Sequence, residues 1–322
     1  MCTGLLCDGA PGWRAPDYGR LVGEKQAMNG PVVVGVDGSP SALAAVDAAA
    51  QEASLRGVGL RVVHAFLWPA MHAPPGSSPL GPATGALHET VERIVADAVE
   101  RARSQAAGLH VSHAVIAGEA STVLQAQSRT AQLIVVGHRG SEGFAELLLG
   151  STAVHLSAHG RCPVMVVRGR PDPAGPVLVA VDGSPRGQPA IAFAFFEAVL
   201  RGTDLVALHV WSTWTGHGEH ALGHPVDLTE LVGDVDRLRQ EEERVLAEAL
   251  SGHRDLYPGV TVQPRLVRGR TRPALIEASA DAQLLVVGAR GHGGFTGRLL
   301  GSVSRAALHH AHCPVTVVRS DL

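Results

Sequence analysis

The sequence predicts an α/β protein of two tandem domains, each a doubly wound parallel sheet of the Rossmann-like type. The chain has 322 residues, which is long for one domain and comfortable for two. The segment VVGVDGSP at 33–40 returns as LVAVDGSP at 178–185. Short valine-rich runs also alternate with longer alanine-rich stretches of helical period, a pattern typical of parallel strands joined by helices.

The internal repeat extends over most of the chain, with two different spacings. His64 corresponds to His209, 145 residues later, whereas Gly137 corresponds to Gly288, 151 residues later. The second copy therefore has six additional residues between these positions. We expect them in the loop around 212–233 or in the helix that follows it.

Two segments lie outside the repeated pattern. Residues 1–29 contain Gly and Pro without periodicity, so we expect a disordered lead, or a translation start at Met28 instead of Met1. Residues 169–175 are rich in Pro and Gly, which suits a domain linker. The predicted organisation is a lead at 1–29, a first domain at 30–168, a linker at 169–175 and a second domain at 176–322.

The elements of the first copy follow in order. Pro31–Val36 is continuously apolar, as a strand buried on both faces should be. A helix is expected over Ser41–Arg56, with Ser39 as its cap and Pro40 at its first position. Further strands are expected at Leu60–Phe66, Val111–Ile116, Leu133–Gly137 and Val164–Val167, and further helices at Leu87–Ala107 and near 120–129 and 151–159. The second copy repeats this order from Val177 to Val318.

Unusual residues follow the first and fourth strands of each copy. In open parallel sheets, ligands bind beyond the carboxyl ends of the strands, where the strand order reverses. Asp37 and Gly137 mark those ends in the first copy, and Asp182 and Gly288 mark them in the second. The sequence therefore predicts one ligand site at this edge of each domain.

A glycine motif follows the fourth strand in both copies. The first copy reads GHRG at 137–140, then nine residues, then Gly150-Ser151; the second reads GARG at 288–291, nine residues, then Gly301-Ser302. Glycines allow close backbone approach to an anion, and the helix that follows presents free amides and a partial positive charge. We expect Ser151 and Ser302 to cap these helices. The motif therefore predicts phosphate binding in each domain.

This spacing, at this place in an α/β unit, resembles the ATP-binding signature of the universal stress protein family, in its tandem two-domain form. The Val-Asp-Gly-Ser openings and the Cys-Pro-Val segments at 162–164 and 313–315 add to the resemblance. It implies a strand order of 3-2-1-4-5 in each domain. It also implies pairing through the last strand, so that the two copies pack as a pseudo-dimer within one chain.

The resemblance implies ATP, with or without Mg, as the ligand. Asp37 and Asp182 would approach the adenine, and the backbone of Ala65 and Val210 would meet it. Arg139 and Arg290 would clamp phosphates, with a solvated loop position as the open alternative for both. The remaining residues implied to line the ribose and phosphate path are Gly137, Gly140, Gly150, Ser151, Gly288, Gly291, Gly301 and Ser302.

Three functions remain open at this stage. The first is a regulatory stress-response protein with an ATP site in each domain. The second is a slow ATPase or nucleotidyl-transfer enzyme, which needs a metal-binding carboxylate and a base. The first loop offers Glu142 and Glu146, whereas the second has His292 and no acid, so no catalytic residue is assigned. The third is an interaction scaffold that binds no nucleotide.

Composition and charge exclude several other function classes. Lys25 is the only lysine, so neither domain has a P-loop or Schiff-base lysine. The net charge is −3 without a basic stripe, so nucleic acid is not an expected partner. No run of 18 apolar residues occurs, so no membrane association is expected. A homodimer and an unidentified protein partner remain open.

The four cysteines lack paired CxxC spacing, which suits a reducing compartment, and we expect a cytoplasmic protein. His309, His310 and His312 cluster beside Cys313 but lack an acidic partner, so no metal site is assigned. Cys162 and Cys313 precede the two last strands. If those strands pair, the thiols could lie close, which leaves a redox role open.

Overall fold

The computed structural model describes residues 30–66, 82–140, 149–170, 172–212, 228–291 and 300–320. The first domain contains β1 (Val32–Gly35), α2 (Pro40–Arg56), β2 (Leu60–Phe66), α3 (Pro82–Gln105), β3 (Val111–Ala117), α4 (Ala120–Gln127), β4 (Leu133–Gly137), α5 (Ser151–His159) and β5 (Val164–Val167). The second contains β6 (Val177–Val181), η3 (Pro185–Gly187), α6 (Gln188–Arg201), β7 (Leu205–Trp211), α7 (Leu228–Leu256), β8 (Val262–Arg268), α8 (Thr271–Ala278), η5 (Ser279–Asp281), β9 (Leu284–Gly288), α9 (Ser302–His310) and β10 (Val315–Val318). The predicted lead at 1–29 lies outside the described residues.

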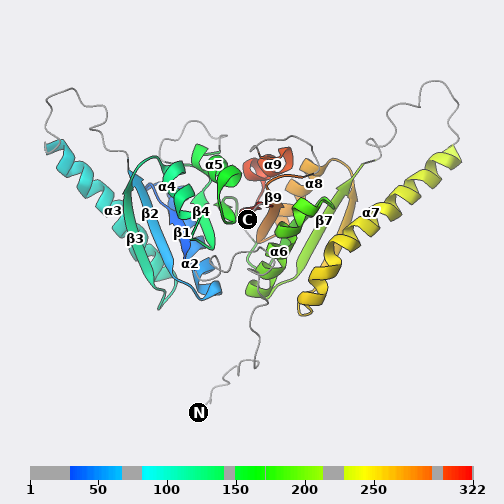
Figure 1. The fold of residues 1–322 in the computed structure, drawn as a ribbon, viewed down its shortest axis with the longest axis horizontal. Coiled ribbons are helices and arrows are strands. Elements are labelled where there is room, and N and C mark those ends of the chain that lie inside the picture. The colour runs from blue at the N-terminus through cyan, green and yellow to red at the C-terminus, as the bar shows by residue number, and fades with distance from the viewer. Residues whose placement is uncertain are drawn as a thin grey trace, which may run out of the picture.

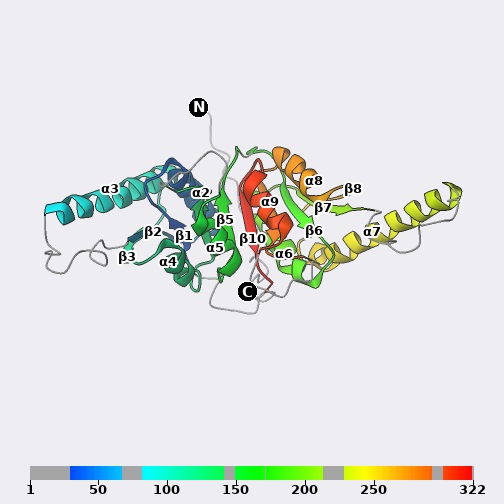
Figure 2. The same ribbon diagram turned by 90° about the horizontal axis from the view of Figure 1, so that it is seen from above.

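The ten strands of the described residues form one sheet, in the order β3-β2-β1-β4-β5-β10-β9-β6-β7-β8 (Figures 1 and 2). Each domain is parallel throughout and has the predicted order 3-2-1-4-5. The two domains meet where β5 pairs with β10, the antiparallel junction of the sheet, with Val166 opposite Val315. The predicted pseudo-dimer within one chain is therefore confirmed.

Helices cover both faces of the sheet. Side chains of α2, α3, α6 and α7 pack on one face, and those of α4, α5, α8 and α9 pack on the other. Neighbouring residues of β1 alternate between these two cores, with Val32 and Val34 in the first and Val33 in the second. This alternation explains why the strand reads as a continuous apolar run.

The long helices differ in length. The α3 helix has 24 residues and α7 has 29, and both extend outward beyond the sheet at opposite ends of the molecule (Figures 1 and 2). Measured from the shared 151-residue spacing, α7 begins five residues before the position equivalent to the start of α3. Most of the six extra residues of the second copy thus lengthen its helix, one of the two places that the sequence predicted.

The first helix of each domain begins differently, although the sequences DGSP are identical. The Ser39 hydroxyl accepts a hydrogen bond from the Ala42 amide at 3.1 Å, and Pro40 is the first helical residue, as predicted. The Ser184 hydroxyl instead donates to the Asp182 carboxylate at 2.8 Å. Ser184 occupies the position before the short η3 turn without a side-chain cap bond, and α6 begins only at Gln188.

Four buried charges join α2 to α6 at the pseudo-twofold axis. Glu52 and Arg56 of α2 correspond to Glu197 and Arg201 of α6, and each arginine pairs with both carboxylates. The side chains are between 0% and 8% exposed. We call this group the buried charge quartet. Each arginine binds one carboxylate on its own helix and one on the other helix, so the quartet links α2 to α6.

The cysteines do not meet at the strand junction. Extending the β5–β10 register places Cys162 opposite Arg319 and Cys313 opposite Arg168. The thiols are therefore about six residues apart along the strands, or roughly 20 Å. Both are buried, and burial raises each thiol pKa to about 12. The suggestion that the thiols lie close is wrong, because antiparallel pairing moves equivalent residues apart.

Candidate functional site

The predicted acidic residue and the motif glycine meet at the carboxyl edge of each domain. Asp37 follows β1 and Gly140 follows β4, and these strands are neighbours in the sheet. A Cβ built on Gly140 would lie 2.8 Å from the Asp37 Oδ2 atom. In the second domain, a Cβ on Gly291 would lie 2.6 Å from the Asp182 Oδ2 atom. In both domains the loop backbone therefore lies directly against the carboxylate.

The aspartates are held in place by their own loops. The Asp37 Oδ1 atom accepts the Ser39 amide at 3.0 Å, and the Asp182 Oδ1 atom accepts the Ser184 amide at 2.9 Å. Gly38 and Gly183 lie between them with φ of +82° and +76°, a conformation that favours glycine. The Val-Asp-Gly-Ser segment is thus a turn that fixes a carboxylate at the strand end.

A buried histidine supports each of these turns. The His64 Nδ1 atom lies 2.8 Å from the Val36 carbonyl oxygen, and the His209 Nδ1 atom lies 2.7 Å from that of Val181. Each acceptor is the residue immediately before the aspartate. These histidines are therefore structural groups, and they fix the strand end just before Ala65 and Val210.

The two ends of each glycine motif lie side by side, at the end of the fourth strand of the domain. The Gly150 amide donates to the His138 carbonyl at 2.8 Å, and the Gly301 amide donates to that of Ala289 at 2.9 Å. The start of α5 thus lies beside the end of β4, and the start of α9 lies beside the end of β9. This places a helix N-terminus next to each Asp–Gly contact.

Both of these helices begin at the predicted serine, but the serine does not cap the helix. Gly150 and Gly301 occupy the capping positions, and among the described residues no side chain caps either helix. The expectation that Ser151 and Ser302 act as caps is therefore wrong, because each is the first helical residue. First-turn amides without a side-chain acceptor attract an anionic ligand.

The two loops are tethered by different helices. In the first domain, the Ser41 hydroxyl of α2 accepts the Arg139 amide at 3.2 Å. In the second, the Ser304 hydroxyl of α9 donates to the Gly288 carbonyl at 2.6 Å. Sequence reasoning missed both serines. Comparing the copies was the available signal, because Ser41 has arginine and Ser304 has alanine as its counterpart.

His138 gives the first site a titratable group that the second site lacks. Its Nδ1 atom lies 3.1 Å from the Val167 carbonyl oxygen and 3.3 Å from the Ser41 hydroxyl. Burial lowers the pKa of His138, and the charges of Arg139 and Arg168 lower it further, against the raising effect of the Val167 hydrogen bond. The imidazole is therefore neutral at pH 7.

Several sequence predictions lie outside what can be placed. Glu142, Glu146 and His292 are outside the described residues. Within the described ranges, no three His, Cys, Asp or Glu side chains converge as a metal site would require. None of the helices in the described part of the chain is both long enough and apolar enough to span a bilayer.

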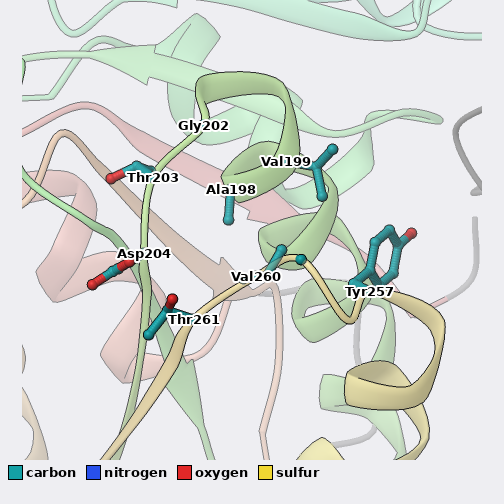
Figure 3. Close-up of a pocket in the computed structure, with 9 residues that line it drawn as sticks. Ala198, Val199, Gly202, Thr203, Asp204, Tyr257, Val260 and Thr261 are labelled. Carbon is teal, nitrogen blue, oxygen red and sulfur yellow. The ribbon is translucent and has the colours of Figure 1, made fainter. Parts of the chain in front are cut away.

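A separate hollow lies at the opposite edge of the second domain, where β7 and β8 begin (Figure 3). It lies between the end of α6 and the segment after α7. Its lining residues are Ala198, Val199, Gly202, Thr203, Asp204, Tyr257, Gly259, Val260 and Thr261. It contains no residue of the glycine motif or the aspartate turn. The carboxyl edge therefore remains the candidate site.

Comparison with known proteins gives consistent matches over both domains. The universal stress protein family model matches residues 28–168 and again residues 174–319. Two universal stress proteins of Mycobacterium tuberculosis are each 39% identical to the chain. One matches over 316 residues (91% of this chain and 96% of the relative), and the other matches over 305 residues (90% and 97%).

The solved structures give the same fold. The crystal structure of a universal stress protein from Archaeoglobus fulgidus covers 90% of this chain and 98% of its own. The TM-score is 0.63 and the sequence identity is 19%, a likeness that concerns the fold alone.

Proposed function

The chain belongs to the universal stress protein family, and from that premise we propose that it is a regulatory protein that binds ATP in each of its two domains. The observation that carries this proposal is the pair of matching cradles. In each, an aspartate lies against a motif glycine, beside a helix whose first-turn amides have no side-chain cap. The same arrangement of aspartate, glycine and helix start occurs in both domains, which favours a shared ligand over a turn needed only for the local fold.

The proposed binding mode assigns adenine and phosphates to different parts of each cradle. Asp37 and the backbone of Ala65 would bind the adenine side in the first domain, and Asp182 and Val210 would do so in the second. Gly137, Gly140, Gly150 and Ser151, with Gly288, Gly291, Gly301 and Ser302, would line the ribose and phosphate path. Since Lys25 is the only lysine and precedes both domains in the sequence, amides, hydroxyls, Arg139, Arg290 and Mg would balance the phosphate charge.

In this proposal the protein binds ATP as a regulator, and hydrolysis of ATP is not its function. Phosphoryl transfer needs a carboxylate to hold the metal and a group that positions the nucleophile. The two acids of the first loop, Glu142 and Glu146, have no counterpart in the second loop. Binding in both domains therefore cannot depend on them. A regulatory protein needs only that ATP bind one conformational state more tightly than another.

Calorimetric titration of Mg-ATP into protein refolded from denaturant tests the proposal, because refolding removes any nucleotide that purifies with the chain. We expect two molecules of ATP per chain. Gly140→Ala and Gly291→Ala should each remove one of them or weaken it at least tenfold, about 1.4 kcal/mol. The physical reason is that the added methyl group overlaps the Asp37 or Asp182 carboxylate, so the loop must move away.

Gly252→Ala is the matched control, because a Cβ at that α7 position meets no atom within 4 Å. It should leave both binding events unchanged and should slightly stabilise the helix, by about 1 kcal/mol at most. The ATP proposal fails if the unmodified chain releases no binding heat at several temperatures. It also fails if Gly140→Ala and Gly291→Ala bind ATP as the control does.

A further inference from the structure

Two arginines cross the pseudo-twofold axis and bind the opposite domain. Arg168 follows β5 and Arg319 follows β10, and they are counterparts 151 residues apart. The Arg168 Nη1 atom donates to the carbonyl oxygens of Ala307 at 3.3 Å and Leu308 at 2.6 Å. The Arg319 Nη1 atom donates to the carbonyl oxygen of Ala158. Each domain thus receives one guanidinium from the other.

The acceptors belong to the two helices that start at the candidate sites. Ala158 lies in the last turn of α5, and Leu308 lies in the last turn of α9. The final carbonyl groups of a helix have no partner within it and carry a negative partial charge, so a cation is well placed there. Each helix has nine residues and spans about 13 Å. The arginine at its end is therefore one short rigid element away from the other domain's site.

The strand that carries each arginine also holds a phosphate loop of its own domain. The Val167 carbonyl oxygen, next to Arg168, accepts the His138 amide at 3.2 Å. The Val318 carbonyl oxygen accepts the Ala289 amide at 2.7 Å. Each arginine therefore connects the loop of its own site to the helix of the other, and the two connections close a ring through both sites.

Both arginines are at least partly buried, unlike the ion pairs of a protein surface. Arg319 is only 8% exposed. Arg168 is half-buried, and within the described residues its buried Nε atom has no hydrogen-bond partner. Burial and the charge of Arg139, the motif arginine of the first site, lower the pKa of Arg168. The positive charges of Arg139 and Arg168 therefore repel each other.

We infer that Arg168 and Arg319 are positioning residues that act across the pseudo-twofold axis: each fixes the helix of the opposite domain's nucleotide site and so couples ATP binding at the two sites. The inference rests on the proposed function. Phosphates bound at the start of α5 would shift this helix, and Arg319 is bonded to its other end. A shift of Arg319 would move the neighbouring Val318, whose carbonyl oxygen binds the Ala289 amide in the loop of the second site. Because coupling between sites is reciprocal, the path through Arg168 has the same effect in reverse.

Hydrogen exchange tests the positioning role without any nucleotide. In the full chain, Arg319→Ala should speed exchange of the α5 amides about tenfold, the usual effect of losing a charge-assisted hydrogen bond, and should leave α9 nearly unchanged. Arg168→Ala should do the reverse. Arg170→Ala is the matched control, since Arg170 is exposed and lies in the same segment. Equal exchange in α5 and α9 for both variants would overturn the cross-domain role.

Titration of Mg-ATP tests the coupling. The affinity of the first site for Mg-ATP is measured in two chains. In the unmodified chain the second site can bind ATP, and in the Gly291→Ala variant the second site is disabled. We expect these affinities to differ at least fivefold. The ratio should fall to one when Arg168→Ala and Arg319→Ala are added, and Arg168→Lys with Arg319→Lys should restore it only in part, since lysine lacks the guanidinium fork.

The outcomes separate the two proposals. Two independent ATP sites in the unmodified chain would overturn the coupling and leave the proposed function standing. A chain that binds no ATP would overturn the proposed function and the coupling together. In that case the exchange experiment still decides whether the two arginines position the opposite helices.

Discussion

At the scale of single residues, His138 is where the two sites differ most in their chemistry. It joins β4, β5 and α2 through its contacts with Val167 and Ser41, whereas its counterpart Ala289 has no side-chain hydrogen-bonding group. The neutral imidazole keeps positive charge away from two nearby arginines. Protonating it would add a third positive charge to this edge.

The stability of the chain should therefore depend on pH through His138. Because burial lowers its pKa in the folded state, the unfolded chain takes up the proton first as the pH falls below about 6.5. The unfolded state then binds more protons, so the free energy of unfolding is full above that pH and falls as the pH decreases. His138→Gln should make this decline shallower between pH 7 and pH 5, as measured by urea denaturation.

His113→Gln, at an exposed position on β3, shows the effect of removing a histidine without touching the site. The role given to His138 is wrong if both variants change the pH dependence equally. It is also wrong if His138→Gln leaves the decline as steep as in the unmodified chain.

The sequence predicted which residues meet at the site only where strand order decides it. Asp37 and Gly140 follow neighbouring strands, so the rule for carboxyl ends brings them together. Ser41, Ser304, Arg168 and Arg319 were not predicted, because each bonds to a residue of another element, and no local sequence pattern shows which elements pack together. The predicted Ser39 cap is confirmed, whereas the caps of α5 and α9 were wrongly predicted, because Gly150 and Gly301 occupy the capping positions and the serine that follows each of them is already helical.

At the scale of elements, the buried charge quartet is the feature on which the pairing of α2 with α6 depends. Burial raises the pKa of Glu197, and the charges of Arg56 and Arg201 oppose that shift. Both arginines have raised pKa values, since the attraction of the two carboxylates outweighs burial. We regard all four groups as charged, because each carboxylate contacts two guanidinium groups.

Glu197→Gln should lower the free energy of unfolding by roughly 3 kcal/mol, because it leaves a buried guanidinium without its full counter-charge. Chemical denaturation at pH 7 measures the change. Glu243→Gln is the control, since Glu243 pairs with Arg239 on the exposed face of α7 and should contribute about 0.5 kcal/mol or less. Similar losses in the two variants would contradict the importance of the quartet.

Element types were predictable from the sequence, but element ends were less so. Valine-rich runs identified the strands because they are buried on both faces. The helix expected at Leu87–Ala107 begins earlier, at Pro82. The η3 turn could not be predicted, because the same DGSP letters cap a helix in one copy, and in the other the serine binds the preceding aspartate.

At the scale of the whole molecule, the two domains share one sheet, one charge quartet and two crossing arginines. Chains of more than about 150 residues with two domains usually unfold through intermediates. Here we expect a single cooperative transition in differential scanning calorimetry, with equal calorimetric and van't Hoff enthalpies. Two resolved transitions would contradict this prediction. Glu197→Gln should move the one peak to lower temperature without splitting it.

The tandem organisation was the most predictable property of the whole molecule. The repeated motifs gave two copies, and the family resemblance gave the strand order and the pairing through the last strand. What the repeat could not give was the distance of each residue from the pseudo-twofold axis. Cys162 and Cys313 lie far from the axis and are separated, whereas Glu52 and Glu197 lie close to it and share two arginines.

The pairing of β5 with β10 inside one polypeptide has a consequence for how the sites can differ. Two separate chains would have to find each other, whereas a short connection keeps the halves at an effective concentration on the order of millimolar at any dilution. Two identical chains would also carry identical cradles. One polypeptide always supplies one cradle with His138 and Ser41 and one with Ala289 and Ser304, in a fixed ratio. Two unequal cradles are then encoded together as a single unit.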